Sequence, residues 1–145
     1  MQTKTITLLL SIVLVVTSHI TIANQTKTKA LSTDPLYRTL IKSVALNDFS
    51  LMASTYHPDA VLVSVDKTTP IQQAIIRWRS EGEKLKSAGS SASLQFRFSN
   101  RIINDSTAFE SGIYRYAILD TTGKETVFYS SFQDLNIYKS GHWLT

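Results

Sequence analysis

The chain contains no cysteine among its 145 residues. It therefore has no disulfide scaffold, no thiolate nucleophile and no cysteine that could carry a lipid. Histidine is also scarce, with three in all, whereas a metal site needs three or four converging ligands. The sequence lacks a glycine-rich phosphate loop and a Gly-x-Ser-x-Gly elbow as well. We therefore expect neither a metal site nor a cofactor.

A concentrated basic patch is missing too. The formal net charge is +4, but the basic residues are scattered along the chain. Arg77 and Arg79 come nearest to forming a basic cluster. Binding to nucleic acid depends on a basic stripe or patch that follows the phosphate backbone. The sequence therefore predicts a solvated surface and no nucleic-acid partner.

The longest apolar run is shorter than the roughly 20 residues that span a bilayer. Lys4 precedes an apolar run over residues 6–16, and small residues follow at 21–23. This layout is typical of a secretory signal peptide cleaved near Ala23, and the short run disfavours the alternative of a retained membrane anchor. We expect a signal peptide over 1–23, a polar leader over 24–33, and a secreted or periplasmic domain with no stable membrane anchor.

Helical patterns dominate the next part of the chain. Pro35 suits the first position of a helix, and Asp34 before it can cap the free amides. Asp48 can cap a second, short helix after the corner at 47–48. A third helix is predicted to start at Pro70, with Trp78 at the end of an apolar stripe and buried against the inner face of a sheet.

Strand patterns follow. Alternating apolar residues predict strands over 61–65 and 94–98, and a long strand from Thr107 to about Leu119. Its antiparallel partner is expected over 125–138, and a further strand begins at 142, while 67–69 reads as a loop. Helices followed by hairpin-connected strands indicate an α+β fold, with the helices on one face of an antiparallel sheet.

Four segments carry a family resemblance: ALNDF at 45–49, YHPDAVL at 56–62, TAFESGIY at 107–114 and SGHW at 140–143. In their order and spacing the chain resembles the SnoaL-like and ketosteroid-isomerase-like domains of the nuclear-transport-factor-type superfamily. The resemblance covers 34–145 and implies a cone-shaped α+β roll. In such a roll, a curved antiparallel sheet wraps around three N-terminal helices, with an apolar cavity at its open end.

The chain also departs from that family. Its isomerase members use an Asp on the first long strand as base and a Tyr in the first helix as acid. The matching positions here are Ser64 and Leu40, which cannot transfer that proton, so steroid isomerisation is not implied. Family members also continue for roughly ten residues beyond the Gly-x-Trp turn, an ordinary strand length. The last strand is therefore expected to be truncated.

Three residues remain catalytic candidates. His57 and Asp59 could form a base and its orienting carboxylate, or Asp59 could fix a His-Pro-Asp turn through backbone amides. Glu110 shares one face of its strand with Tyr114, by the period of two. If that face lines the cavity, Glu110 suits a general base. If it faces outward, Glu110 is a solvated residue that could pair with Arg97.

Two functions of different class fit these observations. The first is an exported domain that binds a small apolar molecule and has no chemistry of its own. The alternative is an enzyme of the cyclase, isomerase or dehydratase kind, using one pocket carboxylate and one Tyr. The expected pocket residues are aromatic: Tyr37, Tyr56, Trp78, Tyr114 and Tyr129. The strand over 125–138 is apolar on both faces, which predicts a homodimer through the sheet.

Overall fold

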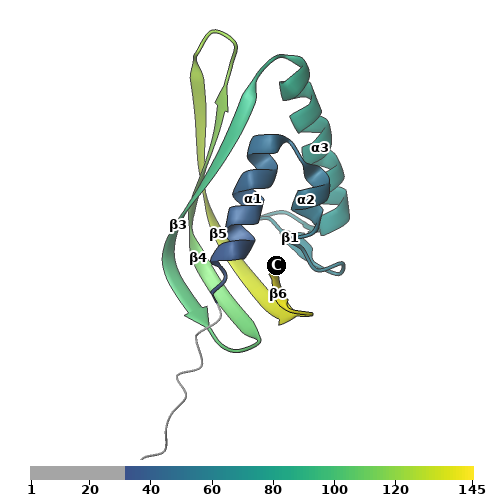
Figure 1. The fold of residues 1–145 in the computed structure, drawn as a ribbon, viewed down its shortest axis with the longest axis vertical. Helices are drawn as coiled ribbons and strands as arrows, with labels where there is room; N and C mark the ends of the chain where they lie inside the picture. Colours follow the sequence, from purple (N-terminus) through teal and green to yellow (C-terminus); the bar gives the residue numbers. More distant parts are fainter. Residues whose placement is uncertain (1–31) are drawn as a thin grey trace, which may run out of the picture.

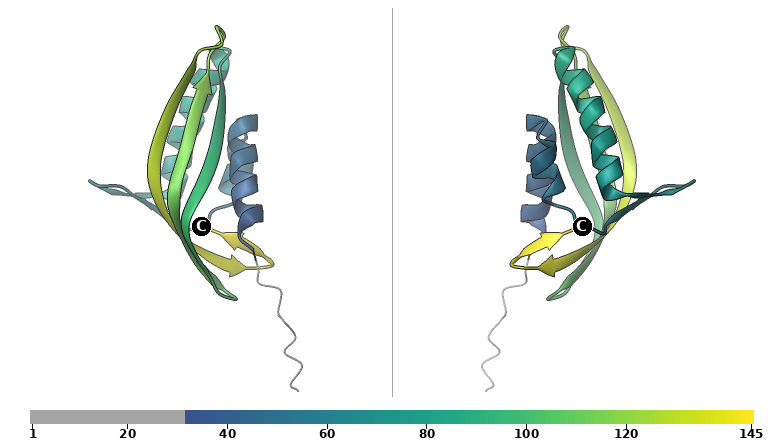
Figure 2. Two further views of the ribbon diagram at one scale, coloured as in Figure 1. Left: turned by 90° about the vertical axis from the view of Figure 1, so that its left-hand side faces the viewer. Right: turned by 90° about the vertical axis from the view of Figure 1, so that its right-hand side faces the viewer.

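The structure, a computed structural model, describes residues 32–145 and has the predicted α+β architecture. Its helices lie on one face of a curved antiparallel sheet (Figures 1 and 2). The sheet has the strand order β3-β4-β5-β6, and a separate two-stranded hairpin pairs β1 with β2. The elements are α1 (Asp34–Leu46), α2 (Phe49–Ala53), β1 (Val61–Val63), β2 (Thr68–Pro70), α3 (Ile71–Ser87), β3 (Ser91–Ile103), β4 (Thr107–Leu119), β5 (Glu125–Lys139) and β6 (His142–Leu144).

The two predicted helix caps have different outcomes. Asp48 does cap α2, because its Oδ1 accepts hydrogen bonds from the amides of Ser50 at 3.1 Å and Leu51 at 2.9 Å. Asp34, however, is the first residue of α1 and not its cap; Thr33 holds the N-cap position without a side-chain cap bond. The prediction that Asp34 caps the helix is wrong, because its carboxylate is engaged by an arginine described below.

The segment after β1 forms a hairpin where a loop was predicted. β1 ends at Val63, and the chain turns back so that Thr68 pairs with Val63 and Pro70 pairs with Val61. Pro70 therefore closes β2, and α3 begins at Ile71. A proline is tolerated there because an edge strand does not need its missing N–H.

Gly82 lies inside α3, which continues unbroken to Ser87. A Cβ at this position would collide with the side-chain oxygen of Asn47 and with the ring of Phe49. The glycine weakens the helix locally, but it lets α3 approach the corner between α1 and α2 closely.

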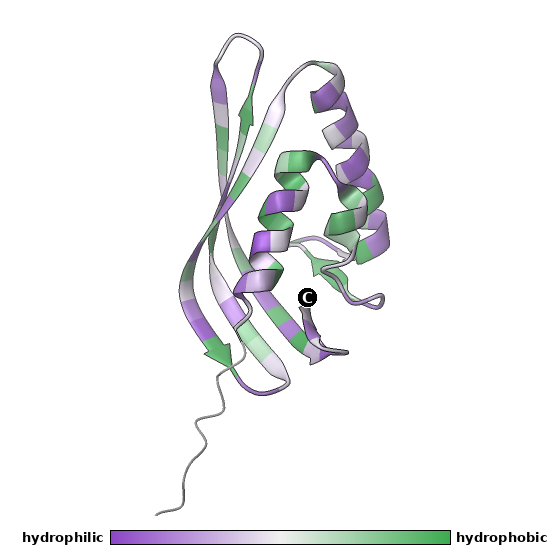
Figure 3. Ribbon diagram, in the orientation of Figure 1, coloured by the Kyte–Doolittle hydropathy of each residue, from purple (hydrophilic) through white to green (hydrophobic). Residues whose placement is uncertain are grey.

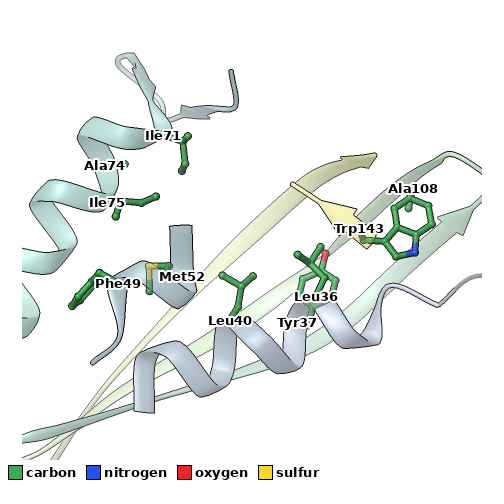
Figure 4. Packing of buried hydrophobic residues seen from close by; sticks show 10 residues of the cluster. All are labelled: Leu36, Tyr37, Leu40, Phe49, Met52, Ile71, Ala74, Ile75, Ala108 and Trp143. Carbon is green, nitrogen blue, oxygen red and sulfur yellow. The ribbon is translucent and has the colours of Figure 1, made fainter. Parts of the chain in front are cut away.

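The hydrophobic core lies between the helices and the inner face of the sheet (Figure 4). Tyr37 on α1, Ile75 on α3 and Trp143 on β6 are among its buried members. Trp78, predicted to be buried against the inner face of the sheet, packs against this core but is only partly buried. Along the strands, hydrophobic and hydrophilic residues alternate, as expected for a sheet with two different faces (Figure 3). None of the helices within 32–145 is long and apolar enough to cross a bilayer.

A bulge in β3 decides which of its side chains face the helices. The register with β4 shifts between Phe98 and Asn100, so one extra residue is accommodated there. Before the bulge, Phe96 and Phe98 face the core; after it, Arg101 is paired with Glu110 on the inner face. An odd insertion reverses the alternation of a strand. The bulge therefore turns the partly exposed side chain of Arg101 toward the inner face, where it meets the buried Glu110.

Candidate functional site

Glu110 is fully buried on the inner face of β4. Its Oε1 accepts hydrogen bonds from the Thr33 hydroxyl at 2.7 Å and from Arg101 Nε at 2.6 Å. Its Oε2 accepts one from Asn136 Nδ2 at 2.8 Å. The sequence left the face of this strand open, and the structure shows that Glu110 points inward. Both carboxylate oxygens are engaged, however, which suits a structural role better than proton transfer to a ligand.

Arg101 extends this network to the start of α1. Its Nη2 lies 2.7 Å from the Asp34 carboxylate, and its guanidinium stacks 4.0 Å from the centre of the Phe98 ring. The hydrogen bond from Arg101 lowers the pKa of the Asp34 carboxyl. Residues Thr33, Asp34, Arg101, Glu110 and Asn136 form what we call the Glu110 cluster. It ties the start of α1 to β3, β4 and β5. Thr33 therefore belongs to the folded domain and not to a polar leader.

Asp134 is a second interior carboxylate, and sequence reasoning did not single it out. The Tyr37 hydroxyl donates a hydrogen bond to its Oδ2 at 3.1 Å. Burial, assisted by the nearby charge of Glu110, raises the pKa of Asp134 to about 6 against the opposing effect of the Tyr37 bond. Burial also raises the pKa of Tyr37, which therefore stays a neutral donor. Asp134 lies two residues after Phe132, which packs against the core, so the period of two in a strand could have predicted that Asp134 points inward.

A cavity of about 540 Å³ opens between the helices and one end of the sheet's inner face. Its wall is rich in aromatic and apolar side chains: Phe49, Met52, Trp78, Tyr114, Tyr116 and Phe128. Two charged residues, Glu81 and Lys86, also line it. Concave, mainly apolar surfaces of this size with a few polar groups are the usual form of small-molecule sites.

The five aromatic residues expected in a pocket wall are placed differently by the structure. Trp78 and Tyr114 line the cavity. Tyr56 does not line it but lies behind Trp78, with ring centres 6.4 Å apart, and Tyr37 packs in the core against Phe96 and Phe98.

Tyr129 is the clear error among them. It pairs with Arg115 on the outer face of the sheet and is 70% exposed. The prediction put Tyr129 in the pocket wall, but successive side chains of a strand point to opposite sides, and the side chain of Tyr129 lies on the face away from the helices.

Of the two alternatives for His57 and Asp59, the base with its orienting carboxylate is not formed. The carboxylate of Asp59 is 92% exposed and lies 3.8 Å from His57 Nδ1, beyond hydrogen-bonding distance. The backbone amide of Asp59 instead donates to that ring nitrogen at 3.2 Å. The His57 ring therefore fixes the turn by accepting this hydrogen bond. The alternative prediction, that the Asp59 side chain fixes the turn, is wrong.

The described region contains two histidines, His57 and His142. His142, the first residue of β6, is exposed, and its Nδ1 lies 3.3 Å from the backbone oxygen of Ser140. No group of three or more His, Asp or Glu residues within 32–145 is arranged to hold a metal ion.

Comparisons with solved structures identify the fold. A ketosteroid isomerase-like protein from Erwinia carotovora atroseptica SCRI1043 is 13% identical, with a TM-score of 0.55, over 78% of this chain and 87% of that one. An NTF2-like superfamily protein from Salmonella enterica serovar Typhimurium LT2 is 9% identical, with a TM-score of 0.58, over 76% and 80%. A protein from Catenulispora acidiphila in complex with S-DNPA is 16% identical, with a TM-score of 0.61, over 77% and 83%.

The chain thus has the NTF2-like fold, as the SnoaL-like resemblance implied. Neither a protein-family model nor a curated protein matches its sequence. At these identities the structural likeness establishes the architecture alone, so the function has to be argued from the site.

Proposed function

We propose that the protein is an exported small-molecule-binding domain whose ligand occupies the 540 Å³ cavity. The observation that carries the proposal is the wall of that cavity, where aromatic rings from α2, α3, β4 and β5 converge. A planar, largely apolar ligand suits such a wall, because it gains apolar burial and ring contacts together. The similar protein from Catenulispora acidiphila was solved in complex with S-DNPA, and this likeness supports the proposal.

A cavity-filling substitution tests the proposal. Ala92 lines the cavity, so Ala92→Trp is expected to occupy its space and weaken binding of the neutral planar dye Nile red at least about tenfold, or about 1.4 kcal/mol. Titrations followed by dye fluorescence measure the dissociation constants. Ser93→Trp is the matched control, because the neighbouring residue points to the opposite face of the same strand.

The control variant should bind Nile red as the unmodified chain does. Equal affinity of all three proteins would place the dye elsewhere, and absence of measurable binding by the unmodified chain would count against the cavity as an apolar ligand site.

Export rests on the apolar run at 6–16 and the small residues before Asn24, which lie outside the described residues. When the full chain is expressed in a bacterial host, the exported product is expected to begin near Asn24. Intact-mass measurement on periplasmic or secreted material checks this. A mass that retains residues 1–23 would contradict cleavage.

An enzyme of the cyclase, isomerase or dehydratase kind is the second candidate, and one observation favours it. Asp134 has a pKa raised to about 6, and the hydroxyl of Tyr37 lies within hydrogen-bond reach. A carboxyl group poised near neutral pH beside a neutral tyrosine suits general acid–base chemistry. Neither residue is part of the cavity wall, however. Binding without chemistry is therefore the better-supported function.

A further inference from the structure

Two aromatic rings lie where the cavity opens to solvent. Tyr116 on β4 and Phe128 on β5 both line the cavity. They are paired across the two strands, and their ring centres lie 6.4 Å apart. Phe128 is 52% exposed and Tyr116 is only partly buried. Both rings are therefore accessible to a ligand that enters the cavity.

Helix geometry places Glu81 on the side of α3 that faces these rings. Trp78 lies three residues before it and Leu85 four residues after it, and residues at this spacing are neighbours on one helical face. Gly82 lies on the other side of the stripe formed by Trp78 and Leu85, where it approaches Phe49 next to the corner between α1 and α2. Glu81 is therefore turned away from that corner and toward the sheet.

We propose that the ligand of the cavity is a planar aromatic molecule with a positive charge, such as a protonated amine, held between Glu81 and the rings of Trp78 and Tyr116. This inference rests on the proposed ligand binding and specifies its ligand class. A cation over the face of a Trp or Tyr ring is attracted by the negative face of the ring. A nearby carboxylate adds a direct attraction between opposite charges.

The charge of Glu81 is available to a ligand. None of the ion pairs within residues 32–145 involves Glu81. Burial, and after it the negative charge of Glu81, raises the pKa of the Tyr116 hydroxyl. The carboxylate therefore acts on the cavity wall and is not neutralised by a basic side chain.

Lys86 also lines the cavity, and its charge would oppose a cationic ligand placed next to it. It belongs to the last turn of α3, where free carbonyl groups carry a partial negative charge that its ammonium group compensates. Five residues after Glu81, it lies on the opposite edge of the stripe formed by Trp78 and Leu85. The two charges thus lie on different sides of the cavity. The aromatic wall favours the cation, because the faces of its rings attract positive charge and not negative charge.

Two dyes of matched shape test the charge preference. Nile red and Nile blue share one planar ring system, but Nile red is neutral and Nile blue is cationic at pH 7. Glu81→Gln keeps the size of the side chain and removes its charge. This variant is expected to lose at least about fivefold more affinity for Nile blue than for Nile red, the effect of one charge pair near water. Fluorescence titrations give the dissociation constants.

Glu83→Gln is the matched control, because Glu83 is an exposed residue of the same helix that does not line the cavity. It should bind both dyes as the unmodified chain does. Ala92→Trp, which fills the cavity, is expected to weaken the binding of Nile blue at least about tenfold and so locates this dye in the cavity. Circular dichroism verifies that each variant is folded.

Three results would overturn the inference: an equal effect of Glu81→Gln on the two dyes, the same selective loss in Glu83→Gln, or Nile blue binding that survives Ala92→Trp. In each case, binding of Nile red in the cavity by the unmodified chain would leave the proposed function standing. If the unmodified chain binds neither dye, the cavity is not a ligand site, and the proposed function fails together with this inference.

Discussion

Replacing Glu110 by Ala is expected to lower the free energy of unfolding by about 1–3 kcal/mol, the cost of leaving buried polar groups without a partner, since Arg101 is partly exposed and keeps its ion pair with Asp34. The loss follows from the groups left behind. Arg101, Asn136 and the Thr33 hydroxyl would each lose the acceptor that they share in the interior. A buried donor without a partner keeps its full desolvation penalty. Denaturant unfolding, with midpoint and slope read separately, measures the change.

Glu125→Ala is the matched control for this experiment. Glu125 also meets an arginine at 2.6 Å, but its pair with Arg115 lies on the surface. Exposed ion pairs contribute little because water and salt screen them. The control is expected to leave the midpoint nearly unchanged. Similar midpoints for the two variants would contradict a structural role for the Glu110 cluster.

Replacing Asp134 by Asn is expected to stabilise the protein at pH 7 by at most about 3 kcal/mol, because the buried carboxylate is then absent. The pKa of Asp134 is raised from 3.8 to about 6 in the folded state, so between these values the folded chain binds more protons than the unfolded chain. Stability contributed by this group is therefore present below pH 4 and is lost as the pH rises through 6. Asn can still accept the hydrogen bond from Tyr37.

The measurement is denaturant unfolding of both proteins at pH 4, 5, 6 and 7, with the pH values chosen to cover that window. The stability difference in favour of Asp134→Asn should grow as the pH rises. Asp120→Asn is the control of opposite sign, because hydrogen bonds from Thr122 and the Lys124 amide lower the pKa of Asp120. If the stability difference between Asp134→Asn and the unmodified chain does not change with pH, the pKa of the Asp134 carboxyl is not raised in the folded protein.

Much of the fold follows from local patterns in the sequence. The alternation of Leu94, Phe96 and Phe98 indicates a half-buried strand, and these side chains do pack on the core. The strand predicted from Thr107 to about Leu119 has those bounds in the structure. Such elements are predictable because the period of side-chain burial is set by backbone geometry, which is the same in every protein.

The candidate site was harder to predict from residue periodicity than the fold was. Trp78 and Tyr114 were expected in a pocket wall and do line the cavity, but Tyr129 on the next strand points away from it. A strand that is apolar on both faces does not reveal which face is inward. The sequence did not identify Asp134 as a candidate, because its raised pKa comes from burial by parts of the chain that are distant in sequence.

By itself the sequence determined the helices, most of the strands and the α+β class, because these depend on residue periodicity and on turn and cap chemistry. Only the tertiary structure decided that Arg101, and not Arg97, meets Glu110. The bulge after Phe98 adds one residue to β3 and reverses the faces of the residues that follow. A single unpaired residue leaves no clear periodic signal, yet it decides which arginine side chain reaches the buried Glu110.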